Sequence, residues 1–307
     1  MKNCKENNNK YKIKKLKLAF SLIEISVVIL IIGILIAGIS QGIDLFADYR
    51  FITAKNLTKN SRVGRIEDLE IWLETTSDES FATGADPYIN LSSDPADGAK
   101  IGLWRDINPK LISANRFNIF RNNVLDNQPT YTKIGINSVP ALKFDNTDSF
   151  NTYSHSSRLN TLKFTNFLVM NHDNLGGSGL NFVLNSRASG VNGYSLLVQK
   201  LTNNIQSLNY MVGSSVGWQG SAAVVKSSEV PIIVTFVFDG ITSKLYRNGV
   251  EYSTSFSGSY VVNGSAQTYL APRGYLGEFI YFSRNLNDIE RSDIEKYLSK
   301  KWAINLN

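Results

Sequence analysis

The chain has 307 residues, of which 43% are hydrophobic and 11% aromatic, with 22 glycines, 7 prolines and one cysteine. This composition is too apolar and too low in proline for a disordered chain. A single cysteine excludes a disulfide framework and any multi-cysteine metal site. The formal net charge of +6 suggests an acidic partner only if the positive charge lies on the folded part of the chain.

The positive charge is confined to the amino terminus. Residues 1–19 contain seven lysines and one glutamate, whereas residues 20–307 carry equal numbers of basic and acidic side chains. Nucleic-acid phosphates are bound by a clustered excess of Lys and Arg on the binding domain itself. We therefore expect no nucleic-acid partner.

The lysines are followed by an apolar run, Phe20–Gly42, that contains a single charge. A helix of about 20 apolar residues can cross a bilayer, and the positive-inside rule leaves the lysine-rich flank in the cytoplasm. We predict a single-pass membrane protein with everything after residue 42 outside the cytoplasm. No Gly or Pro occurs from Ile43 to Val63, so we expect the helix to continue to about residue 64. Its apolar stripe packs either on the globular domain or on neighbouring stalks.

The one charge in this run is Glu24. A carboxylate inside a membrane segment is costly unless it has a partner, so it indicates a function. The residues around it are Ala19-Phe20-Ser21-Leu22-Ile23-Glu24. This setting resembles the type IV prepilin signal, which pilins share with the pseudopilins of type II secretion.

The resemblance implies that a prepilin peptidase cuts between Ala19 and Phe20 and methylates the new amino terminus at Phe20. Glu24 would then pair with the terminal amine of a neighbouring pilin or pseudopilin subunit. The chain departs from the family in having Ala19 where Gly is usual, and its first proline is only Pro87. Two alternatives are an ordinary secretory signal cut near Ser40 and an uncleaved membrane anchor.

From about residue 65 the chain contains short alternating runs separated by turn residues. Strands are predicted at 141–145, 162–167, 180–184, 194–198 and 232–238. Asn248-Gly249 predicts a tight hairpin, and Asn287 with Glu290 predicts the start of a final helix. Together these patterns indicate an antiparallel β-sandwich with a carboxy-terminal helix.

A second resemblance rests on motifs that follow one another in order over residues 66–307. They are Leu69-Glu-Ile-Trp72, Trp104-Arg105-Asp106, Gln128-Pro129-Thr-Tyr131, Pro140-Ala141-Leu142-Lys-Phe144-Asp145, Gly277-Glu-Phe-Ile-Tyr281 and Tyr297-Leu298-Ser-Lys-Lys-Trp302. They resemble the bacterial laminin-G-like, concanavalin A-like jelly-roll module, which implies adhesion, glycan or protein binding, or a spacer role. We therefore divide the chain into a leader at 1–19, a pilin-like helix at 20–64 with its membrane part at 20–42, and a jelly-roll domain at 65–307.

Most aromatic residues in these motifs are expected in the core, because large aromatics dominate sandwich cores. The predicted core aromatics are Trp72, Trp104, Phe144, Tyr281 and Trp302. Trp218 differs, because it lies in the Gly/Ser-rich stretch 212–221, where a loop would expose it for stacking on a sugar. It is the one candidate ligand-binding residue of the head.

No pattern of catalytic residues is found. Hydrolases on this fold place carboxylates alternately along one strand, and the acids Glu67, Asp68, Glu70 and Glu74 do not have that spacing. His155 and His172 lack companions at metal-ligand spacing. We expect no enzyme activity and no cofactor. Calcium binding stays open, because Asp145, Asp148 and Asp173 are oxygen ligands near predicted strand ends.

The main hypothesis is a minor pilin or pseudopilin in the bacterial inner membrane that displays a jelly-roll adhesion head in the periplasm or outside the cell. Its partners would be the prepilin peptidase, other pilin or pseudopilin subunits, the membrane, and glycans or surface proteins. The first alternative is a membrane-anchored, glycan-binding protein that never assembles into a filament. The second alternative is a glycan hydrolase on the same fold.

Overall fold

The structure is a computed structural model that describes residues 21–84, 90–92, 94–111, 120–152, 157–173, 179–187, 190–202, 205–225, 230–262 and 267–307. These residues form two antiparallel sheets, one long helix that precedes them and one helix near the carboxy terminus. The predicted mainly-β sandwich with two flanking helices is therefore confirmed. The chain divides into two compact units, with the boundary between Leu45 and Phe46.

The first helix, α1, runs from Leu22 to Asn60, and the second, α2, from Asp288 to Trp302. The predicted capping box of α2 is present, since the Asn287 side chain accepts hydrogen bonds from the backbone N–H groups of Ile289 and Glu290. Three short 3₁₀ turns are η1 (Val63–Arg65), η3 (Leu125–Asn127) and η4 (Ser157–Leu159).

The first sheet has eight strands. They are β1 (Leu69–Glu74), β6 (Thr130–Ile136), β7 (Val139–Phe144), β9 (Phe164–His172), β14 (Ile232–Phe238), β15 (Thr242–Arg247), β16 (Val250–Ser255) and β18 (Gly274–Phe282). Their order is β16-β15-β14-β9-β18-β7-β6, and β1 pairs with the second half of β18. The predicted turn between β15 and β16 is confirmed, because Asn248 and Gly249 have φ angles of 49° and 82°.

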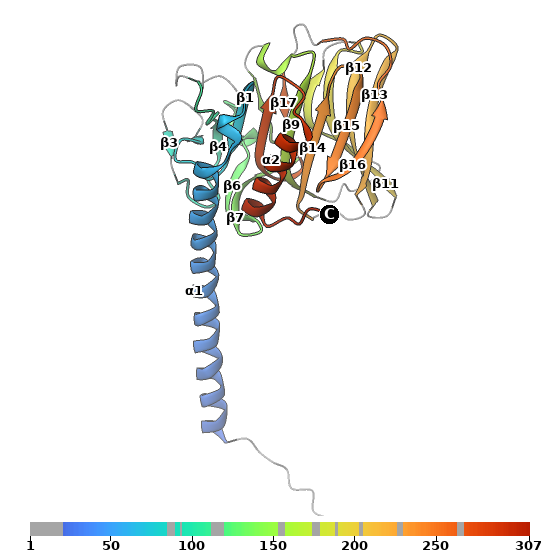
Figure 1. Cartoon of the computed structure of the whole chain (residues 1–307). Helices are drawn as coiled ribbons and strands as arrows, with labels where there is room; N and C mark the ends of the chain where they lie inside the picture. The colour runs from blue at the N-terminus through green and yellow to red at the C-terminus, as the bar shows by residue number, and fades with distance from the viewer. Residues whose placement is uncertain are drawn as a thin grey trace, which may run out of the picture. The chain divides into compact units, whose positions relative to one another are not determined.

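The second sheet has ten strands, several of them very short. They are β2 (Phe81–Thr83), β3 (Asn90–Ser92), β4 (Ile101–Trp104), β5 (Phe120–Arg121), β8 (Phe150–Asn151), β10 (Leu180–Arg187), β11 (Gly193–Thr202), β12 (Ile205–Ser214), β13 (Gly217–Val225) and β17 (Tyr269–Leu270). Their order is β13-β12-β11-β10-β17-β8-β5-β4-β2-β3. The long strands β10 to β13 therefore form one continuous half of this sheet (Figure 1).

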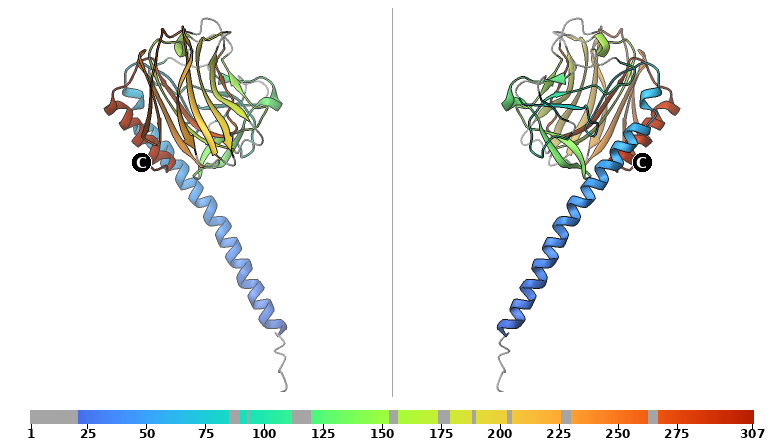
Figure 2. Two further views of the ribbon diagram at one scale, coloured as in Figure 1. Left: turned by 90° about the vertical axis from the view of Figure 1, so that its right-hand side faces the viewer. Right: turned by 90° about the vertical axis from the view of Figure 1, so that its left-hand side faces the viewer.

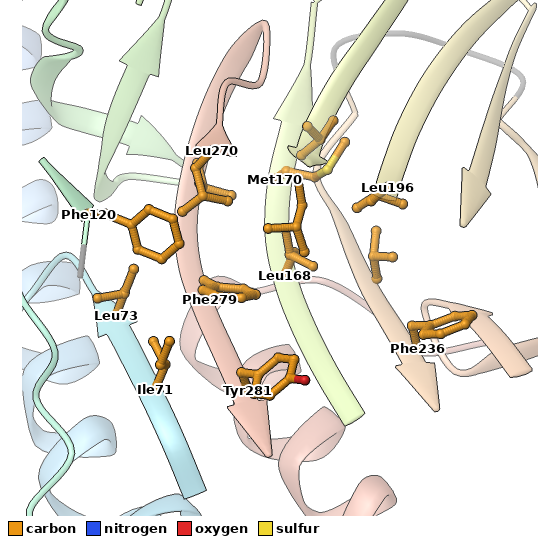
Figure 3. Packing of buried hydrophobic residues seen from close by; sticks show 14 of the residues in the cluster. Ile71, Leu73, Phe120, Leu168, Met170, Leu196, Phe236, Leu270, Phe279 and Tyr281 are labelled. Atoms are coloured by element: carbon orange, nitrogen blue, oxygen red, sulfur yellow. The ribbon is translucent and has the colours of Figure 1, made fainter. Parts of the chain in front are cut away.

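The main core lies between the two sheets. Figure 3 shows Leu168, Phe279 and Tyr281 of the first sheet pointing into the same space as Leu196 and Leu270 of the second. The five aromatics that the sequence assigns to the core are all at most 4% exposed. This part of the sequence interpretation is confirmed, because burying large aromatic side chains supplies much of a sandwich's hydrophobic stabilisation.

A second apolar cluster covers the outer face of the first sheet. It joins Ala54 of α1 and Val63 of η1 to Leu298 and Trp302 of α2, over strand residues such as Ile280. Figure 2 shows α2 on the outside of the strands. The sequence left open whether the apolar stripe of α1 packs on the globular domain or on neighbouring stalks. In the structure, Ala54 of this stripe packs on the globular domain.

Candidate functional site

A cavity of about 350 Å³ lies where the end of β7, the start of β10 and the segment before β18 meet. Both polar and apolar side chains line it. They are Asp145, Asn146, Asp148, Gly179, Leu180, Asn181, Phe182, Ala271 and Arg273. Two carboxylates, two amides and one guanidinium thus face the same space as an aromatic ring and a leucine.

The acidic wall of the cavity is a rigid turn. Asp145 Oδ1 accepts hydrogen bonds from the backbone N–H groups of Thr147 and Asp148 and from the Thr147 hydroxyl. In return, Asp148 Oδ2 accepts a hydrogen bond from the backbone N–H of Asp145. The bonds from Thr147 lower the pKa of the exposed Asp145 carboxyl, whereas burial raises the pKa of Asp148. Asp145 is therefore an ionised acceptor held in one orientation.

The three acids proposed as calcium ligands do not come together as one site. Asp145 and Asp148 share the turn just described, and Asp148 Oδ1 lies 3.6 Å from the ammonium nitrogen of Lys100. Asp173 does not join them: within the described ranges, no three His, Cys, Asp or Glu side chains form a group that could hold a metal ion. The turn therefore presents hydrogen-bond acceptors in the described structure.

The amide wall is held by a buried histidine. Asn181 donates its Nδ2–H to the carbonyl of Ala271 at 3.1 Å, so its Oδ1 faces His172 Nε2 at 3.0 Å. The other ring nitrogen of His172 lies 2.7 Å from the carbonyl oxygen of Asp173. Burial lowers the pKa of His172. The second histidine considered from sequence, His155, lies outside the described residues.

Beyond the cavity, the outer face of the second sheet carries an arginine stacked on two aromatic rings. The guanidinium carbon of Arg187 lies 4.3 Å from the centre of the Trp218 ring and 5.3 Å from that of Phe182. Arg187 is opposite Gly193 in the β10–β11 pair, and Trp218 is opposite Gly213 in the β12–β13 pair. Because neither glycine carries a side chain, Arg187 and Trp218 can reach each other across the intervening strands.

The predicted position of Trp218 in a loop is wrong. Gly217 begins strand β13, and Trp218 is half-buried within that strand rather than fully exposed. The glycines and serines around it favour a loop when they are judged by local composition. In the structure these residues lie within the paired strands β12 and β13 and at the turn between them, where Gly217 adopts a φ of 126°.

Phe182 connects the two features, since it lines the cavity and also contacts Arg187. We call the combined surface the β10 site. It consists of the cavity residues Asp145, Asn146, Asn181, Phe182 and Arg273 together with Arg187 and Trp218. Sequence reasoning found the strand at 180–184 but not its outward-facing Phe182. The strand pairing that brings Arg187 to Trp218 leaves no local signal in the sequence.

A second pair of carboxylates lies opposite each other across two strands but has no access to solvent. Glu74 of β1 and Glu278 of β18 are partners in the sheet register, and both are at most 1% exposed. The ammonium of Lys301 lies 2.7 Å from Glu74 and 2.9 Å from Glu278. In the described structure, these two acids anchor α2 and leave no surface for a substrate.

The residues that the sequence assigns to processing and assembly lie at or before Glu24. Glu24 is in the first turn and exposed, and its carboxylate accepts a hydrogen bond from the backbone N–H of Ser21 at 2.7 Å. Ala19 and Phe20, the predicted cleavage residues, lie outside the described residues. The described part of the chain has one helix that is long and apolar enough to cross a membrane. Cleavage and methylation therefore stay predictions.

No family model matches the chain, and no curated protein matches it. Three solved structures are similar at low identity. The enzymatically active domain of bacteriophage CBA120 tailspike protein 2 is 13% identical over 61% of this chain and 31% of that one, with a TM-score of 0.45. Domain 4 of AbnA, a GH43 extracellular arabinanase from Geobacillus stearothermophilus, in complex with arabinotriose, is 17% identical over 55% and 81% of the two chains, with a TM-score of 0.42. The Ruminococcus gnavus IT-sialidase CBM40 bound to alpha2,3 sialyllactose is 11% identical over 49% and 92%, with a TM-score of 0.36.

Proposed function

We propose that this chain is a membrane-anchored, pilin-like subunit whose jelly-roll head binds glycans at the β10 site. The observation that carries this proposal is the cavity that Asp145, Asn181 and Arg273 line together with Phe182. A sugar presents hydroxyl groups along its edge and C–H groups on its face. Carboxylates, amides and guanidinium groups bind the hydroxyls, and an aromatic ring packs against the C–H face.

The polar groups of the site are fixed before any ligand arrives. Three hydrogen bonds hold Asp145 Oδ1, and the bonds to Ala271 and His172 hold the Asn181 amide. A binding site that is already ordered loses less side-chain entropy when the ligand binds. This order supports a binding role for the cavity.

The test of glycan binding uses the full chain in detergent micelles on a glycan array. We expect Phe182→Ala to weaken binding of any glycan found by about tenfold, which corresponds to roughly 1.4 kcal/mol. The control is Tyr49→Ala, which removes an aromatic ring that is 64% exposed on α1. If the two variants bind equally well, the ligand does not occupy the β10 site.

We propose binding rather than hydrolysis. Glycosidases need two carboxyl groups that both reach the scissile bond. In the cavity, Asp148 is 4% exposed and faces Lys100, which leaves the exposed Asp145 as the single accessible acid. The pair Glu74 and Glu278 is enclosed beneath α2. The test is to incubate the full chain with the glycans that it binds and to analyse them for shortened products. The appearance of such products would contradict this proposal.

The pilin-like part of the proposal rests on Glu24 and the residues that precede it. An exposed carboxylate in the first turn of an apolar helix is well placed to pair with a partner subunit's terminal amine. We propose cleavage before Phe20 by a prepilin peptidase, methylation of Phe20, and assembly from the inner membrane into a pilus or pseudopilus.

Amino-terminal sequencing with mass spectrometry of the exported protein tests the processing step. A start at N-methylated Phe20 is expected, whereas a start at Gln41 or an intact Met1 would contradict it. For assembly, Glu24→Ala should insert into the membrane but fail to enter filaments, while Ser26→Ala, at an exposed position two residues further along the helix, should assemble normally. Normal incorporation of Glu24→Ala would instead favour an anchored glycan-binding protein that does not assemble.

A further inference from the structure

The guanidinium group of Arg187 is held in a fixed orientation. It lies over the Trp218 ring at 4.3 Å and near the Phe182 ring at 5.3 Å, and its side chain is half-buried. Stacking on an aromatic face restrains the planar guanidinium and leaves its N–H groups at the edge of the stack. Those N–H groups match the two oxygens of a carboxylate.

No carboxylate of the described chain pairs with Arg187, and the same holds for Arg273 in the cavity. Other arginines of the described chain do pair with acids. The pairs are Arg62–Asp293, Arg158–Asp106, Arg158–Glu70, Arg284–Asp68, Arg284–Glu290, Arg291–Asp288 and Arg291–Glu295. Among the described residues, the two guanidinium groups of the β10 site therefore have no carboxylate partner.

The acids of the site do not cancel this charge. Asp148 already faces the ammonium of Lys100, so its charge is compensated locally. Asp145 is the remaining acid, and it is fixed by the turn that it closes. With two arginines, Arg187 and Arg273, against one uncompensated acid, Asp145, the site has an excess of positive charge, although residues 65–307 as a whole carry 21 basic and 22 acidic side chains.

We propose, on the basis of the glycan-binding function above, that the β10 site binds an anionic glycan and that Arg187 binds the carboxylate of its acidic sugar. The sugar is a uronic acid or a sialic acid, which present the same carboxylate chemistry. Its ring packs against Phe182 and its hydroxyls bond to Asn181 and Asp145. The half-buried stack makes this ion pair stronger than a fully exposed one, because less water screens it.

The experiment compares ligands that differ in the carboxylate, using the full chain in detergent micelles and isothermal titration calorimetry. One pair is trigalacturonic acid and its methyl ester, and the other is 3′-sialyllactose and lactose. We expect at least one acid to bind about tenfold more tightly than its neutral partner. Arg187→Gln should abolish that preference, because the acid should lose about tenfold more affinity than its neutral partner does.

Two further variants separate a specific contact from general charge. Arg187→Lys keeps the charge but lacks the planar fork, so it should recover only part of the preference. Arg65→Gln removes the same charge from an exposed residue of η1 and should change nothing. Circular dichroism establishes whether each variant is folded. The comparison of each acid with its neutral partner needs no variant, so it tests the anionic preference on the unmodified chain.

The results distinguish the two proposals. Equal binding of both members of each pair overturns the anionic preference but leaves glycan binding standing. An equal loss for acid and neutral ligand in Arg187→Gln, or an equal effect of Arg65→Gln, also overturns the role of Arg187. If no glycan of the array or of these pairs binds, glycan binding by the head fails as well.

Discussion

The ammonium nitrogen of Lys301 lies 2.7 Å from Glu74 Oε2, and neither side chain has any exposed surface. The same ammonium lies 2.9 Å from Glu278, whose carboxylate also accepts hydrogen bonds from the indoles of Trp72 and Trp302. One lysine thus joins α2 to β1 and β18. An ion pair enclosed this fully is tolerated because each carboxylate has several hydrogen-bond donors.

Replacing the lysine by an apolar residue of similar length should strongly destabilise the head. Lys301→Met leaves Glu74 and Glu278 buried without a cation, and breaking a buried pair in this way costs about 3–5 kcal/mol. The measurement is the free energy of unfolding from urea denaturation of the full chain in detergent. Lys300→Met, at the exposed neighbouring position, should stay within about 0.5 kcal/mol of the unmodified chain.

The same cluster makes stability depend on pH. Burial by itself raises the pKa of Glu74, but the charge of Lys301 and the bonds from Lys301 and Thr76 outweigh burial and hold the pKa below its ordinary value of 4.5. Ionised Glu74 therefore stabilises the folded state above pH 4.5, and this contribution is lost as the pH falls through the lowered pKa.

In Lys301→Met the effect of burial is no longer opposed by the charge of Lys301, so the pKa of Glu74 should rise and protonation should relieve the buried charge. We expect the stability difference between this variant and the unmodified chain to shrink as the pH falls, first through the raised pKa of Glu74 in the variant and then, below 4.5, through its lowered pKa in the unmodified chain. Urea denaturation at neutral and acidic pH measures it. A difference that is constant across this range would show that Glu74 is not the titrating partner.

Trp218 should be the tryptophan that solvent reaches. The other three, Trp72, Trp104 and Trp302, are at most 4% exposed, whereas Trp218 is half-buried under Arg187. Acrylamide quenching of the folded chain should therefore come mainly from Trp218 and should nearly vanish in Trp218→Phe. A glycan bound at the β10 site should reduce the quenching. Unchanged quenching in Trp218→Phe would contradict the burial of the other three.

The last turns of α1 should not accept larger side chains on their inner face. Ala54 is 1% exposed and packs in the cluster that contains Trp72 and Trp302, so Ala54→Leu should destabilise the head by about 1–3 kcal/mol through overpacking. Ile52 is 57% exposed, and Ile52→Leu is the matched control. Urea denaturation compares the two, and equal stabilities would show that this face of α1 is not packed.

The sandwich was predictable because its signals are local. Period-two alternation located β7, β10 and β11, a continuous apolar run located the buried strand β14, Asn248-Gly249 identified a hairpin, and Asn287 with Glu290 marked the start of α2. Each of these signals depends on residues within a few positions of one another. The strand order was not predictable, since β18 pairs with β1, β7 and β9, which are distant in sequence.

The β10 site was largely missed for the same reason. Trp218 was a candidate because the residues around it are glycines and serines. Its assignment to a loop was wrong because these small residues can also occupy a strand, where they leave space for large neighbouring side chains. Arg187 and Phe182 had no distinctive spacing. Their relationship to Trp218 depends on three consecutive strand pairings, β10 to β13.

The sequence by itself determined where charge and apolar residues lie along the chain. It separates a lysine-rich leader from an apolar helix that contains Glu24 and from a head in which basic and acidic side chains nearly balance, because these properties are sums over consecutive residues. Only the tertiary structure decided which charges meet. It enclosed Glu74 and Glu278 around Lys301 and placed Arg187 on an aromatic surface where no carboxylate of the described residues pairs with it, because electrostatic partnership depends on distance and burial rather than on order along the chain.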